Sequence, residues 1–261
     1  MFLKKIFNKI NRNIDIIKVL VYKEWIIKYK GTYLGYIWSI AHPLILTLVF
    51  YVGFKIIMKV QIENYVLFLI VALFPWQWFS NSLAIGTWAF IANQSLIKKM
   101  VFPKYLLPLS NIIVDSIHFA ISIPIIMLVL YFYNKPIFYL QWLLYIPLMF
   151  LLQTLLIFSI VLISSTLNVF YRDIDRIISL LIMLIMYASP IFYSANMIPK
   201  KLLPFFYLNP VFPLVNLWRD IFMNGNFNLF DLLILLIHII FWLAIGFVVY
   251  KKYEAFFAER T

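Results

Sequence analysis

The sequence predicts an all-α polytopic membrane protein with six transmembrane helices. Composition supports this class, because 65% of the 261 residues are hydrophobic and only 12% are charged. The mean hydropathy is +0.95. A soluble domain of this length would need far more charged and polar surface to cover its core. Lipid is therefore the expected solvent for much of the surface.

Six apolar stretches supply the predicted spans. A helix rises about 1.5 Å per residue, so roughly 20 residues cross a hydrocarbon layer about 30 Å thick. The stretches of about this length are residues 36–57, 65–91, 106–133, 139–168, 177–194 and 229–250. The connections are short, so residues 36–261 are predicted to form a single transmembrane domain.

Lysine and arginine predict the orientation of the spans. Of the 22 such residues, 16 lie in residues 1–35, the connections after spans two and four, and the C-terminal tail. Basic segments stay on the cytoplasmic side of a membrane. Both termini are therefore predicted to be cytoplasmic, in a multi-pass protein of the cytoplasmic (inner) membrane. This placement accounts for the net charge of +12 without a nucleic-acid partner.

Two segments outside the spans have patterns of their own. Residues 1–35 alternate apolar and basic side chains at helical spacing, which is typical of amphipathic interfacial helices. These helices either anchor the chain in lipid or guide an anionic substrate to a cytoplasmic entrance. Residues 195–228 contain four prolines among many aromatics. They are predicted to form short re-entrant helices on the external side, packed in protein.

The sequence lacks the common catalytic and nucleotide-binding motifs. It has no Gly-rich loop followed by Lys and Ser or Thr, no paired-histidine zinc helix and no nucleophile elbow. Since it has no cysteine, a disulfide framework and a thiolate metal site are excluded. Work against a gradient would have to draw on an ion or on another subunit.

Asp115 and His118 are ionisable residues inside the predicted span 106–133. Their i, i+3 spacing puts them on one helix face, and ionisable residues within a span usually mark a function. The alternative is that they lie near the cytoplasmic end of a long helix, satisfied by each other and by water. The sequence leaves both interpretations open.

Several short motifs follow one another from about residue 20 to the C-terminus. In these motifs the chain resembles the ABC-2 type permeases that export polysaccharides, namely O-antigen, capsule and teichoic acid. The motif residues are Leu34, Gly35, Trp38, Pro43, Tyr171, Arg172 and Asp173, together with Lys98–Pro103, Ser189-Pro190 and Asn209-Pro210.

The resemblance implies the permease half of an ATP-driven exporter, with a second copy of this chain and two copies of a separate ABC ATPase. ATP and Mg would bind to that ATPase, so this chain would hold no cofactor, metal or catalytic residue. The substrate would be a polyprenyl-pyrophosphate-linked glycan. Residues 93–103 would form a coupling helix on the ATPase, residues 1–35 an interfacial and gate region, and residues 195–225 an external gate.

The resemblance also implies three groups of site residues. Sugar C–H faces pack on aromatic rings, so aromatic side chains would line the channel unless they anchor in lipid instead. Basic side chains at the entrance would meet the pyrophosphate. The candidates are Trp76, Trp78, Phe79, Tyr187 and Phe192 for the channel; Lys4, Lys5, Lys9, Arg12 and Lys30 for the entrance; and Lys98, Lys99, Phe102 and Pro103 for ATPase coupling.

Two other functions stay open. An ABC-2 type exporter of drugs or small lipids would share this architecture. A membrane-embedded enzyme such as a glycosyltransferase would need an acidic pair, and Asp173 and Asp175 have a suitable spacing. Each has an arginine neighbour, so local ion pairs are the predicted state of both carboxylates.

Overall fold

The fold is a bundle of long helices joined by short turns, with no strand among the described residues. The computed structural model describes residues 2–33, 35 and 37–257, and the side chains of 2–9 and 139 lie outside the described part. The helices are α1 (Phe2–Tyr29), α2 (Ile37–Phe50, continued by a π-helix over Tyr51–Ile57), α3 (Tyr65–Thr87), α4 (Ala89–Ala92), α5 (Gln94–Lys99), α6 (Leu106–Phe132), α7 (Tyr139–Phe170), α8 (Ile174–Tyr187), α9 (Leu203–Phe206), α10 (Val211–Asn224) and α11 (Leu229–Tyr253).

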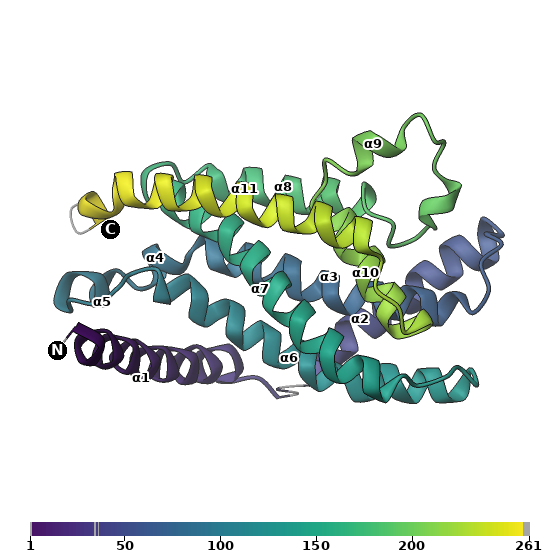
Figure 1. The fold of residues 1–261 in the computed structure, drawn as a ribbon, viewed down its shortest axis with the longest axis horizontal. Helices are drawn as coiled ribbons and strands as arrows, with labels where there is room; N and C mark the ends of the chain where they lie inside the picture. The colour runs from purple at the N-terminus through teal and green to yellow at the C-terminus, as the bar shows by residue number, and fades with distance from the viewer. Residues whose placement is uncertain (1, 34, 36, 258–261) are drawn as a thin grey trace.

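The long helices run roughly along the long axis of the molecule, as Figure 1 shows. Both termini and α5 lie at one end, which we call the terminus end, and α9 lies at the other, which we call the opposite end. Two contacts support this placement. Lys104, just before α6, donates to the Glu254 carbonyl (3.1 Å), and the rings of Phe170 and Tyr253 lie 4.9 Å apart.

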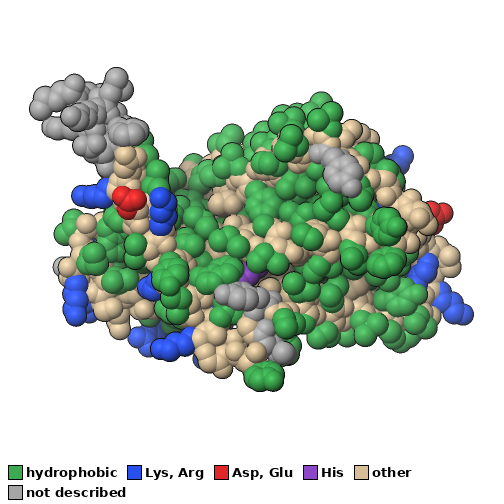
Figure 2. Space-filling model, turned by 90° about the horizontal axis from the view of Figure 1, so that it is seen from below, with side chains coloured by type: hydrophobic (Ala, Val, Ile, Leu, Met, Phe, Trp, Pro, Cys, Tyr) green, Lys and Arg blue, Asp and Glu red, His purple; other side chains and the backbone are tan. Residues whose placement is uncertain are grey.

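Five helical segments are long and apolar enough to cross a membrane: Ile37–Ile57, Tyr65–Thr87, Leu106–Phe132, Leu140–Phe170 and Leu229–Phe256. They confirm five of the six predicted spans, and with them an integral membrane protein. On the surface, apolar side chains cover the middle of the molecule, and Lys and Arg side chains lie toward its two ends, as Figure 2 shows.

The sixth predicted span, 177–194, is not confirmed. Its helix α8 has 14 residues and ends at Tyr187, which corresponds to about 21 Å of helix at 1.5 Å per residue. Pro190 explains the early end, because proline lacks an N–H and disfavours helical geometry in the residue before it. The hydroxyl of that residue, Ser189, donates instead to the Ile185 carbonyl of the last helical turn (2.7 Å).

Helix α3 forms the centre of the bundle. It contacts α2, α6, α7, α8 and α10, and 78% of its most apolar 18-residue segment is buried. The corresponding fractions are only 11% for Ile37–Ile57 and 17% for Leu229–Phe256. The first and last spans therefore present large apolar faces that lipid or another chain must cover.

The N-terminal segment is one continuous helix, and its placement as interfacial helices on the membrane surface is not confirmed. Helix α1 runs alongside α6 at the terminus end, as Figure 1 shows. It ends at Tyr29, and Gly31 follows with a φ of +79°, a left-handed conformation that glycine adopts without strain. The Lys30 amide still donates to the Ile26 carbonyl (2.9 Å), which completes the last turn.

The Pro-rich stretch 195–228 contains the short helices α9 and α10 at the opposite end. Helix α10 packs against α3, α7 and α11, and its Trp218 and Phe222 are fully buried. It ends at Gly225, where a Cβ would lie 2.4 Å from the Phe138 ring, so only glycine fits this position. Helix α10 is thus covered by protein, whereas α9 (Leu203–Phe206) has no buried residue.

Candidate functional site

The main polar cavity lies between the end of α1 and the helices α2, α3 and α6. Its volume is about 350 Å³. Its lining combines aromatic rings with hydrogen-bonding side chains. The lining includes Lys28, Trp38, Ser39, His42, Gln77, Trp78, Asn81, Asp115, His118 and Phe119.

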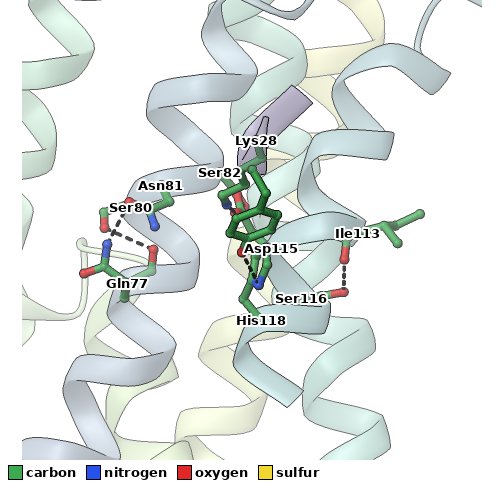
Figure 3. A network of polar contacts seen from close by, with 10 residues as sticks. Lys28, Gln77, Ser80, Asn81, Ser82, Ile113, Asp115, Ser116 and His118 are labelled. Carbon is green, nitrogen blue, oxygen red and sulfur yellow. Dashed lines mark hydrogen bonds and ion pairs between the residues drawn. The ribbon is translucent and has the colours of Figure 1, made fainter. Parts of the chain in front are cut away.

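The Asp115 carboxylate is paired with side chains of two other helices. It lies on α6 with 3% of its surface exposed. Its Oδ1 forms an ion pair with Lys28 of α1, and its Oδ2 accepts a hydrogen bond from the Ser82 hydroxyl of α3 (2.7 Å). Figure 3 shows the three side chains converging. A buried carboxylate needs such partners because the loss of its hydration is otherwise uncompensated.

His118 lies one turn further along the same face of α6, and its partners also come from α1. The Tyr29 hydroxyl lies 2.8 Å from its Nε2 and 2.9 Å from its Nδ1. The Trp25 ring stacks on the imidazole at 5.0 Å between centroids. The shared face of Asp115 and His118 was predicted, but their partners were not. Lys28 and Tyr29 are 87 and 89 positions away from Asp115 and His118 in sequence, too far for a local pattern to indicate.

A second polar chain crosses the cavity from α2 to α3. The Nδ1 of His42 lies 2.9 Å from the Oε1 of Gln77, and the Gln77 amide donates to the Oδ1 of Asn81 (2.7 Å). Gln77 and Asn81 are one turn apart on α3, so they share a face, as Figure 3 shows. These amides were not predicted as site residues, although their polarity within an apolar run was a usable signal.

The predicted channel aromatics are not brought together into one path. Trp76, Trp78 and Phe79 are at most 3% exposed within the chain, and only Trp78 lines the cavity. Phe192 is buried at 1%, with its ring 5.9 Å from the ring of Tyr187. Of the five side chains only Tyr187 is exposed, at 59%. Channel lining stays a prediction for this group.

The predicted coupling segment lies at the terminus end (Figure 1). Lys98 and Lys99 are exposed on α5, whereas Phe102 and Pro103 are partly buried in the extended chain that follows. The helix covers Gln94–Lys99 rather than all of 93–103. The Lys23 side chain of α1 donates to Asn93, just before α5, so the N-terminal helix and this segment are directly linked.

The predicted entrance and motif residues lie at several places. Arg12, Lys30, Tyr171, Arg172 and Asp173 are exposed, while Pro43 is buried and Gly35 and Trp38 line the cavity. The side chains of Lys4, Lys5 and Lys9, and all of Leu34, lie outside the described residues.

The predicted local ion pairs of Asp173 and Asp175 do not form. Among the described residues, neither carboxylate lies within ion-pair distance of an arginine. The indole N–H of Trp88 donates to Asp175 instead (2.7 Å). Trp88 precedes α4, so this bond fixes the start of α8 against the end of the central helix.

The turn after α8 is held by residues that the sequence did not single out. The Arg219 guanidinium of α10 donates to the Pro190 carbonyl (2.7 Å) and lies 3.6 Å from the centre of the Phe68 ring. Nearby, the Tyr65 hydroxyl donates to the Phe192 carbonyl (2.8 Å). Together they attach the backbone of 190–192 to α3 and α10.

Tyr207, between α9 and α10, ties this region to α11. Its hydroxyl donates to the Asp231 carboxylate (2.7 Å). Burial and this negatively charged acceptor raise the pKa of Tyr207, so it keeps its proton as a donor. Among the described residues, no three His, Cys, Asp or Glu side chains are grouped so as to hold a metal ion.

Comparison with known proteins agrees with this architecture. The sequence profile of the ABC-2 type transporter family matches residues 16–223. Two proteins of Klebsiella pneumoniae, each named "O-antigen export system permease protein RfbA", are 41% identical over 245 residues, 94% of both chains. A Myxococcus xanthus protein of the same name is 31% identical over 205 residues, 78% of both chains. The chain therefore belongs to the ABC-2 type transporter family.

Proposed function

We propose that this chain is the permease subunit of an ATP-driven exporter that moves a lipid-linked polysaccharide of the O-antigen type across the cytoplasmic membrane. The observation that carries this proposal is the 41% identity, over 94% of both chains, to permeases named for O-antigen export. The family membership and the five membrane-crossing segments support transport rather than catalysis. The exported glycan would be carried on a polyprenyl pyrophosphate.

A second copy of this chain and two copies of an ABC ATPase complete the proposed exporter. The sequence has no nucleotide-binding loop, so ATP and Mg bind to the ATPase. The exposed lysines of α5 provide a basic surface for it at the terminus end. The apolar faces of α2 and α11 are mostly unburied within the chain, and a second copy as well as lipid would cover them.

We also propose six crossings, with the terminus end on the cytoplasmic side. Helix α7 ends near Tyr253, the last residue of α11, and α11 starts at the opposite end (Figure 1). The chain between them must return to the opposite end, and α8 with the turn at 188–194 makes this passage. The excess of lysine and arginine at the terminus end supports its cytoplasmic location.

Exposed basic side chains and one exposed aromatic ring mark the proposed route of the glycan. Arg12 and Lys30 are exposed and are suited to attract the pyrophosphate, with 1–35 as the gate region. Tyr187 is exposed at 59% and is the best placed of the five aromatics to line a path between two copies. Residues 195–225 would form the external gate.

Deletion of the chain in its host tests the function. Surface polysaccharide should disappear and lipid-linked glycan should accumulate in the cytoplasm, with recovery on re-expression together with the ATPase. Unchanged surface glycan with altered drug resistance would indicate an exporter of drugs or small lipids. Sugar transfer by the purified chain alone would indicate an enzyme.

Charge reversal on α5 tests the coupling assignment. The double variant Lys98→Glu/Lys99→Glu should insert normally but lose export and ATPase co-purification, because its charge at the ATPase surface is reversed. Lys200→Glu/Lys201→Glu is the matched control, since it reverses two adjacent exposed lysines near α9, at the opposite end, and should keep ATPase co-purification. Normal export by the α5 variant would remove the coupling assignment.

A further inference from the structure

The exposed apolar stripe of α11 ends in a pair of lysines at the terminus end. Its side chains include Ile240, Phe247 and Val248, which are 41–69% exposed. Residues three and four positions apart share one helix face, so the exposed Lys251 and Lys252 continue this stripe. We propose that this end of α11 binds an anionic phospholipid of the cytoplasmic leaflet, with its acyl chains along the stripe and its phosphate at the two lysines.

The spacing along α11 matches the thickness of one leaflet. The eight positions from Ile240 to Val248 correspond to about 12 Å of helix at 1.5 Å per residue. Half of a hydrocarbon layer is about 15 Å thick. The two lysines follow about 5–6 Å further along the helix, and lysine side chains near a helix end extend toward the membrane surface. A phospholipid on the stripe therefore places its phosphate close to both amines.

Both lysines are available to a ligand. They are exposed, and neither forms an ion pair with a described residue. The carboxylate nearest in sequence is that of Glu254, which accepts a hydrogen bond from the Tyr250 hydroxyl within the chain (2.6 Å). A phosphate is thus the stronger acceptor that Lys251 and Lys252 lack within the described part of the chain.

A third cation lies at the same end of the bundle. The ring of Tyr253 lies 4.9 Å from the ring of Phe170, the last residue of α7, which brings the connection after α7 close to the two lysines. Arg172 in this connection is exposed and forms no ion pair with a described residue. The adjacent Asp173 is exposed as well, so Arg172 attracts a phosphate less strongly than the lysines do.

The combination of charge and apolar surface favours a phospholipid over a protein partner. A second copy of the chain, which has a net charge of +12, would bring its own basic terminus end to a symmetric contact, and like charges repel. A partner in the cytosol reaches the lysines but leaves the stripe within the bilayer uncovered. An anionic phospholipid covers both parts, since its acyl chains contact the stripe and its headgroup contacts the cations.

Local fluorescence quenching tests the inference on the full chain in nanodiscs of neutral phosphatidylcholine. The chain lacks cysteine, so Val248→Cys carries a single thiol for a fluorophore on the stripe. Phospholipids with a nitroxide on the acyl chain quench this fluorophore. Half-maximal quenching should need about 5- to 30-fold less labelled phosphatidylglycerol than labelled phosphatidylcholine, the effect of one to two lysines. High salt should reduce this preference, because the lysines are exposed.

Charge variants in this labelled background locate the headgroup. Lys251→Gln/Lys252→Gln should remove most of the preference for phosphatidylglycerol, whereas Lys251→Arg/Lys252→Arg should keep it because the charge is retained. Arg172→Gln should have a smaller effect than the glutamine pair. Lys200→Gln/Lys201→Gln is the matched control, since it neutralises two adjacent exposed lysines at the opposite end, and it should leave the preference unchanged.

Four results would overturn the inference. Equal quenching by both lipids in the parent, or equal behaviour of the glutamine and arginine pairs at 251 and 252, would exclude a site for anionic phospholipid. Absence of quenching by either lipid would show that a second copy covers the stripe. Displacement of phosphatidylglycerol by a smaller amount of polyprenyl phosphate would assign the stripe to the glycan carrier.

The lipid site and the proposed function stand or fall separately. Unchanged surface glycan after deletion of the chain would remove the proposed function and leave the quenching results in place. Equal quenching by the two lipids would remove the site and leave the exporter.

Discussion

The contacts of α1 with α6 and of α7 with α11 are of opposite kinds. Helix α1 is held to α6 by an ion pair, a hydroxyl–imidazole contact and a ring stack. Helix α11 is held to α7 by close approach, since a Cβ on Gly246 would lie 2.9 Å from the Ser159 carbonyl oxygen. Lipid tails are as apolar as leucine, so helices in a membrane associate through such polar contacts or such close packing.

This difference indicates which of the two helix contacts can be replaced by contacts with other groups. Water, a ligand or another side chain can take over the polar partners of Lys28 and Tyr29, so α1 can move away from α6 without rupturing the bundle. The α7–α11 contact depends on shape and has no substitute partner. We therefore expect changes at the first contact to act locally on α1 and changes at the second to act on the whole fold.

The largest expected effect is on α1 docking. Lys28→Met leaves the Asp115 carboxylate buried without its cation, and removing one partner of a buried ion pair costs about 3–5 kcal/mol. The partial exposure of Lys28, at 26% of its side chain, places the effect at the lower end. The chain lacks cysteine, so a Leu20→Cys variant carries a single thiol, at a buried position of α1. Maleimide reacts with this thiol only when α1 separates from the bundle, so the labelling rate reports the docking of α1.

Labelling should rise about tenfold or more in the Lys28→Met background, because 1.4 kcal/mol corresponds to a factor of ten. Lys30→Met is the control, since Lys30 is exposed, and labelling of Leu20→Cys in this background should not change. Equal labelling in both backgrounds would mean that the ion pair does not hold α1.

The next effect is on the whole bundle. Gly246→Ala adds a Cβ against backbone, and such overpacking costs about 1–3 kcal/mol. The Tm of the purified chain in detergent should fall, while labelling of Leu20→Cys at moderate temperature stays low. Gly53→Ala is the matched control because nothing lies within 4 Å of its added Cβ. A Tm unaffected by Gly246→Ala would show that α7 and α11 separate easily.

The smallest effect concerns Ser82, which supports the ion pair from α3. Ser82→Ala removes one hydrogen bond to Asp115, worth about 0.5–1.5 kcal/mol. Labelling of Leu20→Cys should increase by less than in Lys28→Met. Ser116→Ala serves as the control, because the Ser116 hydroxyl donates to the Ile113 carbonyl of its own helix (Figure 3) and to no other group in the described part of the chain. An equal response to both changes would exclude a role of Ser82 in docking.

The sequence predicted best what depends on local composition. An apolar run of about 20 residues is a local signal, so five spans were recognised from it. The predicted span 177–194 is not confirmed, because helix α8 ends at Tyr187 while the hydropathy continues past it, and Pro190 was a visible signal for the end of the helix. The nearly continuous apolarity of 65–79 could also have indicated a buried central helix, since a helix apolar on all sides is buried or faces lipid.

The candidate site was predicted only in part, because its contacts join distant segments. Asp115 and His118 stand out within an apolar helix, whereas nothing local marks Lys28 and Tyr29 among the many basic and aromatic residues of α1. The channel aromatics illustrate the same difficulty. Composition shows that Trp76 and Phe79 are apolar, but only the packing of α3 decides whether they face a path or the interior.

The central position of α3 sets an order of events during synthesis. A ribosome completes α3 before α6, α7 and α10, the helices that cover it. Gln77 can already pair with His42 of α2, but Ser82 lacks its partner Asp115 until α6 emerges. The nascent chain thus depends on a temporary cover for its second span, and a chaperone of membrane insertion would act at this stage.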